Sequence, residues 1–372
     1  MDAIIQFIRQ LYGEPEAFIP LHAPVFTGRE KEYLADCIDT TFVSSVGEYV
    51  TRFEDMTREF TGAARAVAVV NGTCGLSAAL QLVGVEPGDL VLTQALTFVA
   101  TANAISHAGA TPVFLDSDRD TLGMSPEALK TYLARNAAAA SRIKACVPVH
   151  ILGHACRIRE ICAICEAHGI PVVEDAAEGL GSFLDGKHLG TFGKLGVLSY
   201  NGNKTITTGG GGMILAGDET FGNHVKHMTA TAKVPHRWEF RHDAVAWNYR
   251  MPNLNAALGC AQMEKLDEIL ADKRAVAKAY KEFFANVDGI DYVDALPGCL
   301  SNYWLNTVLF ADRERRDAFL ARSNDAGVMT RPLWTLMADL PMYEGLHHDG
   351  LANARWLAER AVNLPSGPRL KA

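Results

Sequence analysis

The sequence contains no apolar run close to the ~18 residues that a helix needs to cross a bilayer. Its first residues, MDAIIQFIRQ, lack the long apolar core and small-residue cleavage site of a secretory signal. Positive charge is also scarce, since 35 Lys and Arg stand against 43 Asp and Glu, for a net charge of −8. We therefore expect a cytoplasmic protein that binds neither a membrane nor a nucleic acid.

Motifs for a metal or a dinucleotide are missing as well. One Cys-x-x-Cys pair, Cys162 and Cys165, lies in RIREICAICEAHG, whose apolar spacing predicts an amphipathic helix with both thiols on its core-facing side. Without a second such pair, we expect free thiols and no metal site. The segment NGTCGLS does not supply Gly-x-Gly-x-x-Gly after the first strand, which argues against a nicotinamide dehydrogenase.

The chain has 372 residues, 48% hydrophobic and 21% charged, which indicates a globular protein with more than one core. From about Asn255 onward, charged helical patterns such as MEKLDEILADKRAVAKAYKEFFANV alternate with short strands such as YWLNTVLF. We therefore predict a large domain over residues 1–245 and a smaller α+β domain over residues 246–372.

The central motif is SYNGNKTITTGGGG, where Lys204 stands between the apolar strand GVLSYN and the glycines 209–212. These glycines let the backbone pack closely or take a positive φ before the next apolar stretch, MILAG. A lysine in such a loop is more often a solvated charge, so its neighbours must decide. At the mouth of a buried sheet, its amine is able to form a Schiff base with a carbonyl.

A second motif, PVVEDAAEGLGS, predicts a buried strand that ends in the acidic pair Glu174 and Asp175. We expect one of these carboxylates to be structural. The other, at a strand's carboxyl end, is suited to hold a pyridine nitrogen in its protonated form, which makes the ring an electron sink. A strand-end acid and a strand-end lysine together predict pyridoxal phosphate as cofactor.

The segment ARAVAVVNGTCGLSAALQLVGV predicts a strand, a glycine turn and a helix, with Gly72 and Thr73 where the helix begins. Free N–H groups and a hydroxyl then point toward one spot. Two interpretations stay open: Thr73 only caps the helix, or the same helix end also binds a phosphate. Likewise, His150 ends another apolar strand and is either a structural donor or a group near the cofactor.

These motifs, in this order, resemble those of the DegT/DnrJ/EryC1/StrS family of sugar aminotransferases, from IPLHAPVFTG near residue 19 to AVNLPSGP near residue 361. The resemblance implies the fold-type-I architecture of pyridoxal phosphate enzymes: an α/β large domain, with a mostly parallel sheet between helices, and a smaller α+β domain. The branch it resembles most acts on nucleotide-linked 4-keto-6-deoxy-N-acetylhexosamines, as in legionaminic acid and bacillosamine pathways.

The resemblance also implies roles for individual residues. Lys204 and Asp175 are the expected catalytic residues. The expected cofactor contacts are Gly72, Thr73, Cys74 and Ser199 at the phosphate, Phe98 and Ala177 on opposite faces of the ring, and Glu178 near its 3-oxygen. Two positions depart from the family pattern: Glu178 is often histidine or glutamine, and Gly210 is often glutamate. The role of Glu178 is therefore left open, because a carboxylate repels a phenolate unless they share a proton.

Further resemblances concern the partner and the substrate. AWNYRMPNLNAALG resembles a segment that reaches into a second subunit, where Asn248 contacts the neighbour's cofactor phosphate with Arg250 nearby. This implies a two-fold homodimer with a shared active site. The expected substrate-side residues are His22, Gly47, Arg250 and Arg331, the last in TRPLWTLMADLPMY, where Arg331 and Trp334 fit packing between domains equally well.

The implied reaction moves an amino group from L-glutamate to a nucleotide-linked 4-keto-6-deoxy sugar, UDP-4-keto-6-deoxy-GlcNAc, to give a 4-amino sugar for surface glycan biosynthesis. A 3-keto-sugar aminotransferase retains the same motifs and stays an alternative. A sugar 3-dehydratase replaces the lysine with histidine, so Lys204 argues against it. A non-catalytic cofactor-binding regulator is the alternative from another class, although no helix-turn-helix segment or basic arm is evident.

Overall fold

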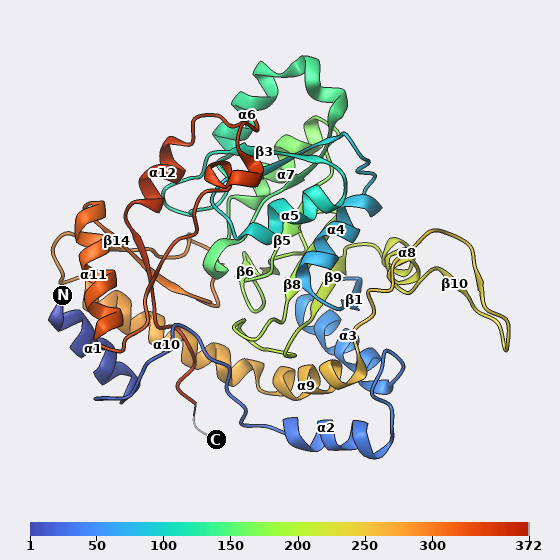
Figure 1. Cartoon of the computed structure of the whole chain (residues 1–372), viewed down its shortest axis with the longest axis horizontal. Helices are drawn as coiled ribbons and strands as arrows, with labels where there is room; N and C mark the ends of the chain where they lie inside the picture. The colour runs from blue at the N-terminus through green and yellow to red at the C-terminus, as the bar shows by residue number, and fades with distance from the viewer. Residues whose placement is uncertain (371–372) are drawn as a thin grey trace.

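The computed structural model describes residues 1–370, and its centre is a sheet of seven strands (Figure 1). Two hydrogen-bonded groups, β1-β9-β8-β5 and β3-β2-β4, are joined because parallel bridges link the β4 side to β5 at Val149 and Asp175. In spatial order the strands are β1 (Arg65–Val69), β9 (Gly212–Ala216), β8 (Leu195–Ser199), β5 (Val173–Asp175), β4 (Ile143–Val147), β2 (Leu90–Gln94) and β3 (Thr111–Leu115).

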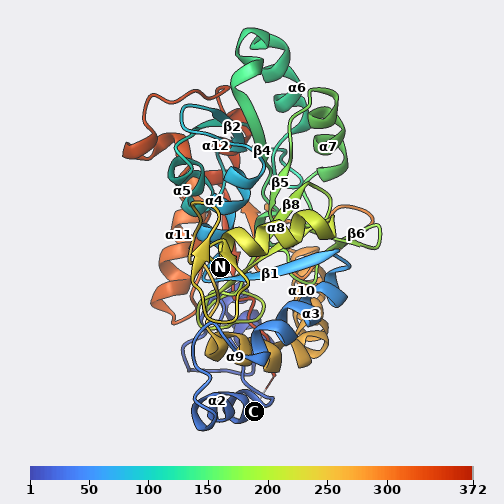
Figure 2. The same ribbon diagram turned by 90° about the vertical axis from the view of Figure 1, so that its right-hand side faces the viewer.

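Helices cover both faces of this sheet, as Figures 1 and 2 show from two sides. One face packs against α4 (Gly72–Leu82), α5 (Val99–His107) and α8 (Glu219–Thr229). The opposite face packs against α6 (Pro126–Arg135), α7 (Ile158–Ala167), α3 (Glu48–Thr61) and α9 (Asn253–Glu264). The strands are almost completely buried because both faces are covered, which explains their continuous apolar sequences. The prediction of a mostly parallel sheet between helices is confirmed.

The direction of β9 decides where the site forms. Strands β2, β3, β4, β5 and β8 pair in parallel, whereas β9 runs antiparallel to β8 and β1. Its first residue, Gly212, is therefore in register with Ser199 at the end of β8 and with Val69 at the end of β1. The carboxyl ends of these strands meet at one edge, the usual ligand site of such sheets.

The C-terminal part forms a second sheet with its own helices. An antiparallel sheet has the order β12-β14-β16-β15, and α10 and α11 pack beside it. Its elements are α10 (Leu266–Phe284), β12 (Ile290–Tyr292), β14 (Asn306–Phe310), α11 (Arg313–Asp325), β15 (Arg331–Pro332), α12 (Ala352–Ala358) and β16 (Ala361–Leu364).

The contacts of two helices cross the boundary proposed from sequence. Helix α1 (Asp2–Tyr12) buries Ile4, Ile5 and Ile8 in one core cluster with α10 and β14, in the C-terminal part. Helix α9 instead packs on α3 and α2 (Glu30–Asp39), which come early in the chain. The division at residues 245 and 246 stays a prediction.

Short elements complete the fold. A hairpin of β10 and β11 projects from the body (Figure 1) and leaves Trp238 69% and Phe240 81% exposed. The remaining elements are β6 (Phe183–Leu184), β7 (Lys187–His188), β10 (Lys233–Val234), β11 (Arg241–His242), β13 (Cys299–Leu300) and 3₁₀ turns at Ala137–Arg142, Ile151–Gly153, Met337–Asp339 and Pro341–Tyr343. None of the helices described over residues 1–370 is both long and apolar enough to cross a membrane.

Candidate active site

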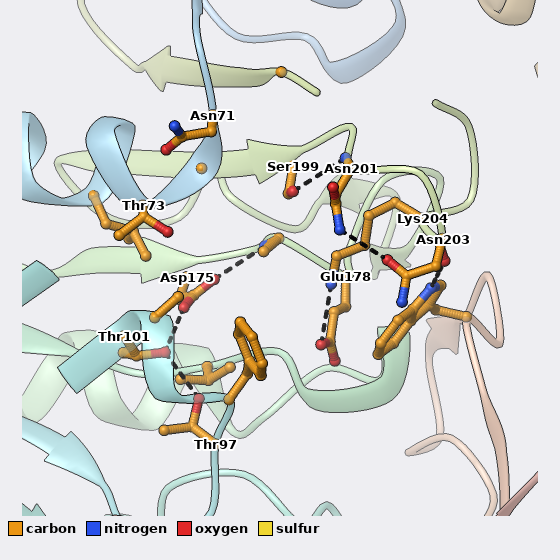
Figure 3. Close-up of a pocket in the computed structure, with 18 of the residues that line it drawn as sticks. Asn71, Thr73, Thr97, Thr101, Asp175, Glu178, Ser199, Asn201, Asn203 and Lys204 are labelled. Carbon is orange, nitrogen blue, oxygen red and sulfur yellow. Dashed lines mark hydrogen bonds and ion pairs between the residues drawn. The ribbon is translucent and has the colours of Figure 1, made fainter. Parts of the chain in front are cut away.

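A cavity of about 300 Å³ opens at the sheet edge where β1, β5 and β8 end (Figure 3). Its wall brings together residues that the sequence analysis singled out in separate segments: Gly72, Thr73, Phe98, Asp175, Ala177, Glu178, Ser199 and Lys204. Asn203 and Trp334 also lie on this wall.

Lys204 lies in the connection between β8 and β9 and points its amine into the cavity. Its side chain is 13% exposed, and Nζ lies 3.3 Å from Oε1 of Glu178. On the other side, Nζ lies 4.0 Å from the centroid of the Trp304 ring. The amine is thus held between a carboxylate and an aromatic face, within the cavity and not in bulk solvent.

Asp175 ends β5 and is 4% exposed. Its Oδ2 accepts a hydrogen bond of 2.7 Å from the hydroxyl of Thr101, and its Oδ1 accepts one of 3.1 Å from the amide of Ala177. Burial raises the pKa of Asp175, while these hydrogen bonds and the charge of Lys204 act in the opposite direction. No ion pair to Asp175 occurs within residues 1–370, so this buried acid suits a positively charged ring nitrogen.

Glu174 is the structural member of the acidic pair. It is fully buried, and its two oxygens accept hydrogen bonds from the amides of Gly190, Phe192 and Gly193. The same carboxylate lies 2.8 Å from Nε2 of His150, which is itself 0% exposed. The open question about His150 is therefore answered: it is a structural donor that fixes the loop beside β5 and does not line the cavity.

The N-terminus of α4 has backbone amides suited to an anion. Its cap is Asn71, whose Oδ1 accepts from the amide of Cys74 at 2.8 Å. The interpretation in which Thr73 caps the helix is wrong, and the amide of Cys74 is already used. Cys74 does not line the cavity, and its contact with the phosphate stays a prediction. The amides of Gly72 and Thr73 stay free for an anion among the backbone hydrogen bonds described.

Gly212 is the position in the glycine run 209–212 where a side chain would collide with the backbone before α4. A Cβ on this residue would lie 2.7 Å from the carbonyl carbon of Asn71 and 2.8 Å from the amide nitrogen of Gly72. The start of β9 therefore has to be glycine for the anion site to keep its backbone position. Beside it, Ser199 places its hydroxyl on the cavity wall.

Phe98 is the N-cap residue of α5, and 51% of it is exposed at the cavity. Its ring centroid lies 6.3 Å from that of Trp334. A large aromatic face left open to a cavity is suited to stack on a flat ligand. Ala177 also lines the cavity and leaves space for such a ring.

Glu178 is 6% exposed and makes two contacts with its two oxygens. Oε2 accepts from the amide of Leu152 at 2.7 Å, and Oε1 faces Nζ of Lys204. Burial raises the pKa of this carboxyl, and the charge of Lys204 lowers it. A raised pKa favours the shared proton that a neighbouring phenolate requires.

A protein-family comparison matches residues 25–372 to the model of the DegT/DnrJ/EryC1/StrS aminotransferase family. The chain belongs to this family. It is 36% identical to the GDP-perosamine synthase of Escherichia coli O157:H7, over 95% of this chain and 94% of that protein. It is 35% identical to the putative pyridoxal phosphate-dependent aminotransferase EpsN of Bacillus subtilis (strain 168), over 95% and 92% of the two chains.

Among solved structures, the aminotransferase TlmJ from Streptoalloteichus hindustanus matches with a TM-score of 0.88 and 29% identity, over 95% of each chain. The family resemblance seen in the sequence is thereby confirmed, as are the fold-type-I architecture and pyridoxal phosphate dependence. The protein is an aminotransferase. The free amides at α4 and the unpaired buried carboxylate of Asp175 fit the two charged ends of this cofactor.

Other residues expected in the site do not line the cavity of this aminotransferase subunit. Nε2 of His22 lies 2.9 Å from Nζ of Lys273 in a separate buried contact. Gly47 is the N-cap residue of α3, where a Cβ would lie 2.2 Å from Cγ of Asn253, and Arg331 lies exposed on β15. A substrate contact of these residues within one subunit is not supported.

Asn248 and Arg250 do not line the cavity of their own subunit either, although Arg250 forms a β-bridge with Val69 at the end of β1. Nε of Arg250 donates to Oδ1 of Asn248 at 2.9 Å, and Asn248 is exposed. This exposure leaves Asn248 free to reach a second subunit, so its contact with a neighbour's cofactor stays a prediction.

Sequence reasoning missed several residues on the wall or behind it. Asn71 had a readable signal, because asparagine directly before a helical pattern is a preferred N-cap. Thr101 and Trp304 had no such signal in the sequence, since a threonine in the first turn of a helix and a tryptophan before a strand are usually packing residues. Only the fold shows that they contact Asp175 and Lys204.

Proposed function

We propose that this aminotransferase moves the amino group of L-glutamate to the C4 ketone of a nucleotide-linked 4-keto-6-deoxy sugar. The observation that carries the proposal is one cavity that holds a lysine amine, a buried unpaired acid and a free helix N-terminus. The name of the GDP-perosamine synthase, 36% identical over nearly the whole chain, supports a nucleotide sugar as acceptor.

Each group then has one task. The amides of Gly72 and Thr73, with the hydroxyl of Ser199, bind the cofactor phosphate at the helix end. The carboxylate of Asp175 accepts a hydrogen bond from the ring nitrogen. Bound pyridoxal phosphate supplies an electron sink for the electrons of a C–H bond.

Lys204 is the proton carrier. Its Nζ, which lies between Glu178 and Trp304, would take a proton from the substrate carbon and deliver it to C4′ of the bound cofactor. Phe98 and Ala177, which both line the cavity, would pack on the two faces of the cofactor ring and exclude water from it. Glu178 holds a proton between its carboxyl and the ring's 3-oxygen, which its raised pKa favours.

The two lines of support for the acceptor differ in the nucleotide that carries the sugar. The branch resemblance points to UDP-4-keto-6-deoxy-GlcNAc, whereas two relatives named GDP-perosamine synthase, from Escherichia coli O157:H7 and Vibrio cholerae, each 36% identical, point to a GDP-linked sugar. We place the sugar at the mouth of the cavity, where Phe98 and Trp334 present aromatic surface.

A homodimer completes the proposal. The projecting β10–β11 hairpin and the segment after it expose Trp238, Phe240 and Val245, the last at 99%. Apolar side chains that one subunit leaves in water are expected to pack against a second copy. The exposed Asn248 follows directly and then contributes to the cavity of that copy.

The deciding experiment offers L-glutamate with a panel of UDP-, GDP- and TDP-linked 3-keto and 4-keto sugars, and follows products by mass and NMR. An amine at C4 of one nucleotide sugar supports the proposal, and an amine at C3 supports the alternative. If glutamate changes the visible absorbance of the bound cofactor but no keto sugar is aminated, the acceptor class is wrong. If glutamate produces no change in the visible absorbance of the bound cofactor, L-glutamate is not the amino donor.

The shared site has its own test. Lys204→Ala and Asn248→Ala subunits, each inactive alone, are mixed under conditions that allow exchange. The mixture should regain about a quarter of wild-type activity, because random mixing makes half of the dimers mixed and each of these has one intact site out of two. Exchange is verified with differently tagged subunits, and a verified exchange without any recovery contradicts the shared site.

A further inference from the structure

Trp304 connects the C-terminal part of the chain to the catalytic lysine. It lies just before β14 and is 4% exposed. Its ring faces Nζ of Lys204 at 4.0 Å, and its Nε1 donates a hydrogen bond of 2.7 Å to the carbonyl of Asn203. One side chain therefore contacts both the end of Lys204 and the backbone directly before it.

Asn302 holds Trp304 and its surroundings in place. It is 0% exposed, and its Oδ1 accepts from the amide of Trp304 at 2.7 Å. Its Nδ2 donates to the carbonyls of Glu178 and Leu180, at 2.7 Å each, and lies 3.2 Å from the hydroxyl of Thr205. This single amide ties together the segment of Glu178, the segment of Lys204 and the ring that faces Lys204.

The backbone around this amide is strained. Tyr303 and Leu152 have φ of 46° and 60°, the left-handed region that non-glycine residues seldom adopt. Gly153, at φ 90°, approaches so closely that a Cβ there would lie 1.9 Å from Oδ1 of Asn302. Such strain persists only where the surrounding contacts over-determine the conformation, and it gathers at functional sites.

The contacts of Trp304 and Glu178 define where the amine of Lys204 lies. A lysine stem has several rotatable bonds, so an amine that has left the cofactor needs a defined place from which to act. The face of Trp304 attracts an ammonium group, and Oε1 of Glu178 lies 3.3 Å from the same atom. We infer that Trp304, fixed by Asn302, is a positioning residue that keeps Nζ of Lys204 at the bonding position in the cavity. This inference depends on the cofactor and not on which sugar is the acceptor.

The experiment compares two forms of the cofactor on cofactor-free protein. Pyridoxal phosphate forms a bond with Lys204, whereas pyridoxamine phosphate has no aldehyde and uses only the phosphate and ring contacts. For Trp304→Leu we expect about a tenfold weaker affinity for pyridoxal phosphate and a change of less than about threefold for pyridoxamine phosphate. Asn302→Asp, which removes the amide donors, should behave in the same way.

Conservative and control variants separate positioning from folding. Trp304→Phe keeps an aromatic face and should restore most of the affinity for pyridoxal phosphate. Trp356→Leu and Asn306→Asp alter a partly buried tryptophan and an equally buried asparagine away from the cavity, and should change neither affinity. Thermal melting of each cofactor-free variant shows that it is folded.

A double-mutant cycle provides the second readout. When Lys204→Ala has already removed the amine, adding Trp304→Leu should leave the affinity for pyridoxal phosphate within about twofold of Lys204→Ala alone. An equal loss for both cofactor forms, or a loss that persists in the Lys204→Ala background, overturns the inference and makes the network a scaffold only. Unchanged affinities in Trp304→Leu overturn it too.

Discussion

Thr101 supports the acid that the cofactor requires, and Thr101→Val removes this support without changing the shape of the side chain. The residue is 1% exposed, and its hydroxyl donates to Oδ2 of Asp175 at 2.7 Å. Its oxygen also lies 2.8 Å from the hydroxyl of Thr97. Because Thr101 has one hydroxyl proton and gives it to Asp175, Thr97 must be the donor in the second hydrogen bond.

The expected loss follows from these contacts. A hydrogen bond to a charged group contributes about 1.5–3 kcal/mol, and about 1.4 kcal/mol corresponds to a factor of ten in rate. We expect the hydrogen bond from Thr101 to Asp175 to stabilise mainly the transition state, so its loss should lower the kcat/KM for L-glutamate about 10- to 100-fold. The unpaired hydroxyl of Thr97 should lower the free energy of unfolding as well.

The pH dependence gives a more specific signature. Burial raises the pKa of Asp175, and the hydrogen bond from Thr101 is among the contacts that lower it. Without that bond the pKa of Asp175 rises further, so a larger fraction of the acid is protonated at a given pH. The ionised form is the one that holds the ring nitrogen, and the acidic limb of kcat/KM should therefore move to higher pH.

The assay is the stopped-flow rate of the glutamate half-reaction across pH. Thr101→Ser keeps the hydroxyl and should stay within about threefold of wild type. Thr93→Val is the matched control, because this buried threonine donates to the carbonyl of Val147 away from Asp175. A Thr101→Val enzyme with wild-type kcat/KM and an unmoved acidic limb would falsify the role given to Thr101.

Three further predictions concern the same cavity. Lys204→Ala should bind the cofactor but lose at least about 10³-fold in turnover; normal turnover would show that another lysine is used. Gly212→Ala should weaken cofactor binding by about 1–3 kcal/mol, measured by fluorescence titration, because its Cβ meets backbone, while Gly217→Ala, with open space around its Cβ, should not. The raised pKa of Glu178 means that the cofactor-free protein loses stability as the pH rises through that pKa. Glu178→Gln should reduce this loss, measured by urea unfolding as the pH rises above the ordinary range of a glutamate carboxyl, and an unchanged pH dependence argues against a raised pKa of this buried carboxyl.

Many residues of the cavity could be predicted from local sequence patterns. Strand-end residues such as Asp175 and Ser199 follow continuous apolar runs, and the carboxyl ends of such strands meet at one sheet edge. The glycine run after Lys204 marked a close backbone approach, which the contact of Gly212 with the start of α4 explains. These residues could be placed near the cavity from the sequence because each placement depended on a few neighbouring residues.

The positions that the sequence left open depended on choices between equivalent local options. Both Asn71 and Thr73 are acceptable caps, and the helix begins after Asn71 because its Oδ1 reaches the amide of Cys74. His150 fitted two roles until the structure placed it 2.8 Å from buried Glu174. Local sequence cannot tell such options apart, since the deciding partner lies elsewhere in the chain.

The sequence by itself determined the kind of chemistry, because an amine, an acid and a helix start each stand at the end of a strand or a few residues after it, and so share one edge of the sheet. Only the tertiary structure decided how the lysine is held. Asn302 and Trp304 come about a hundred residues after Lys204, and Thr101 comes from a helix 74 residues before Asp175. Their contacts arise from packing between distant segments, which leaves no periodic pattern in the chain.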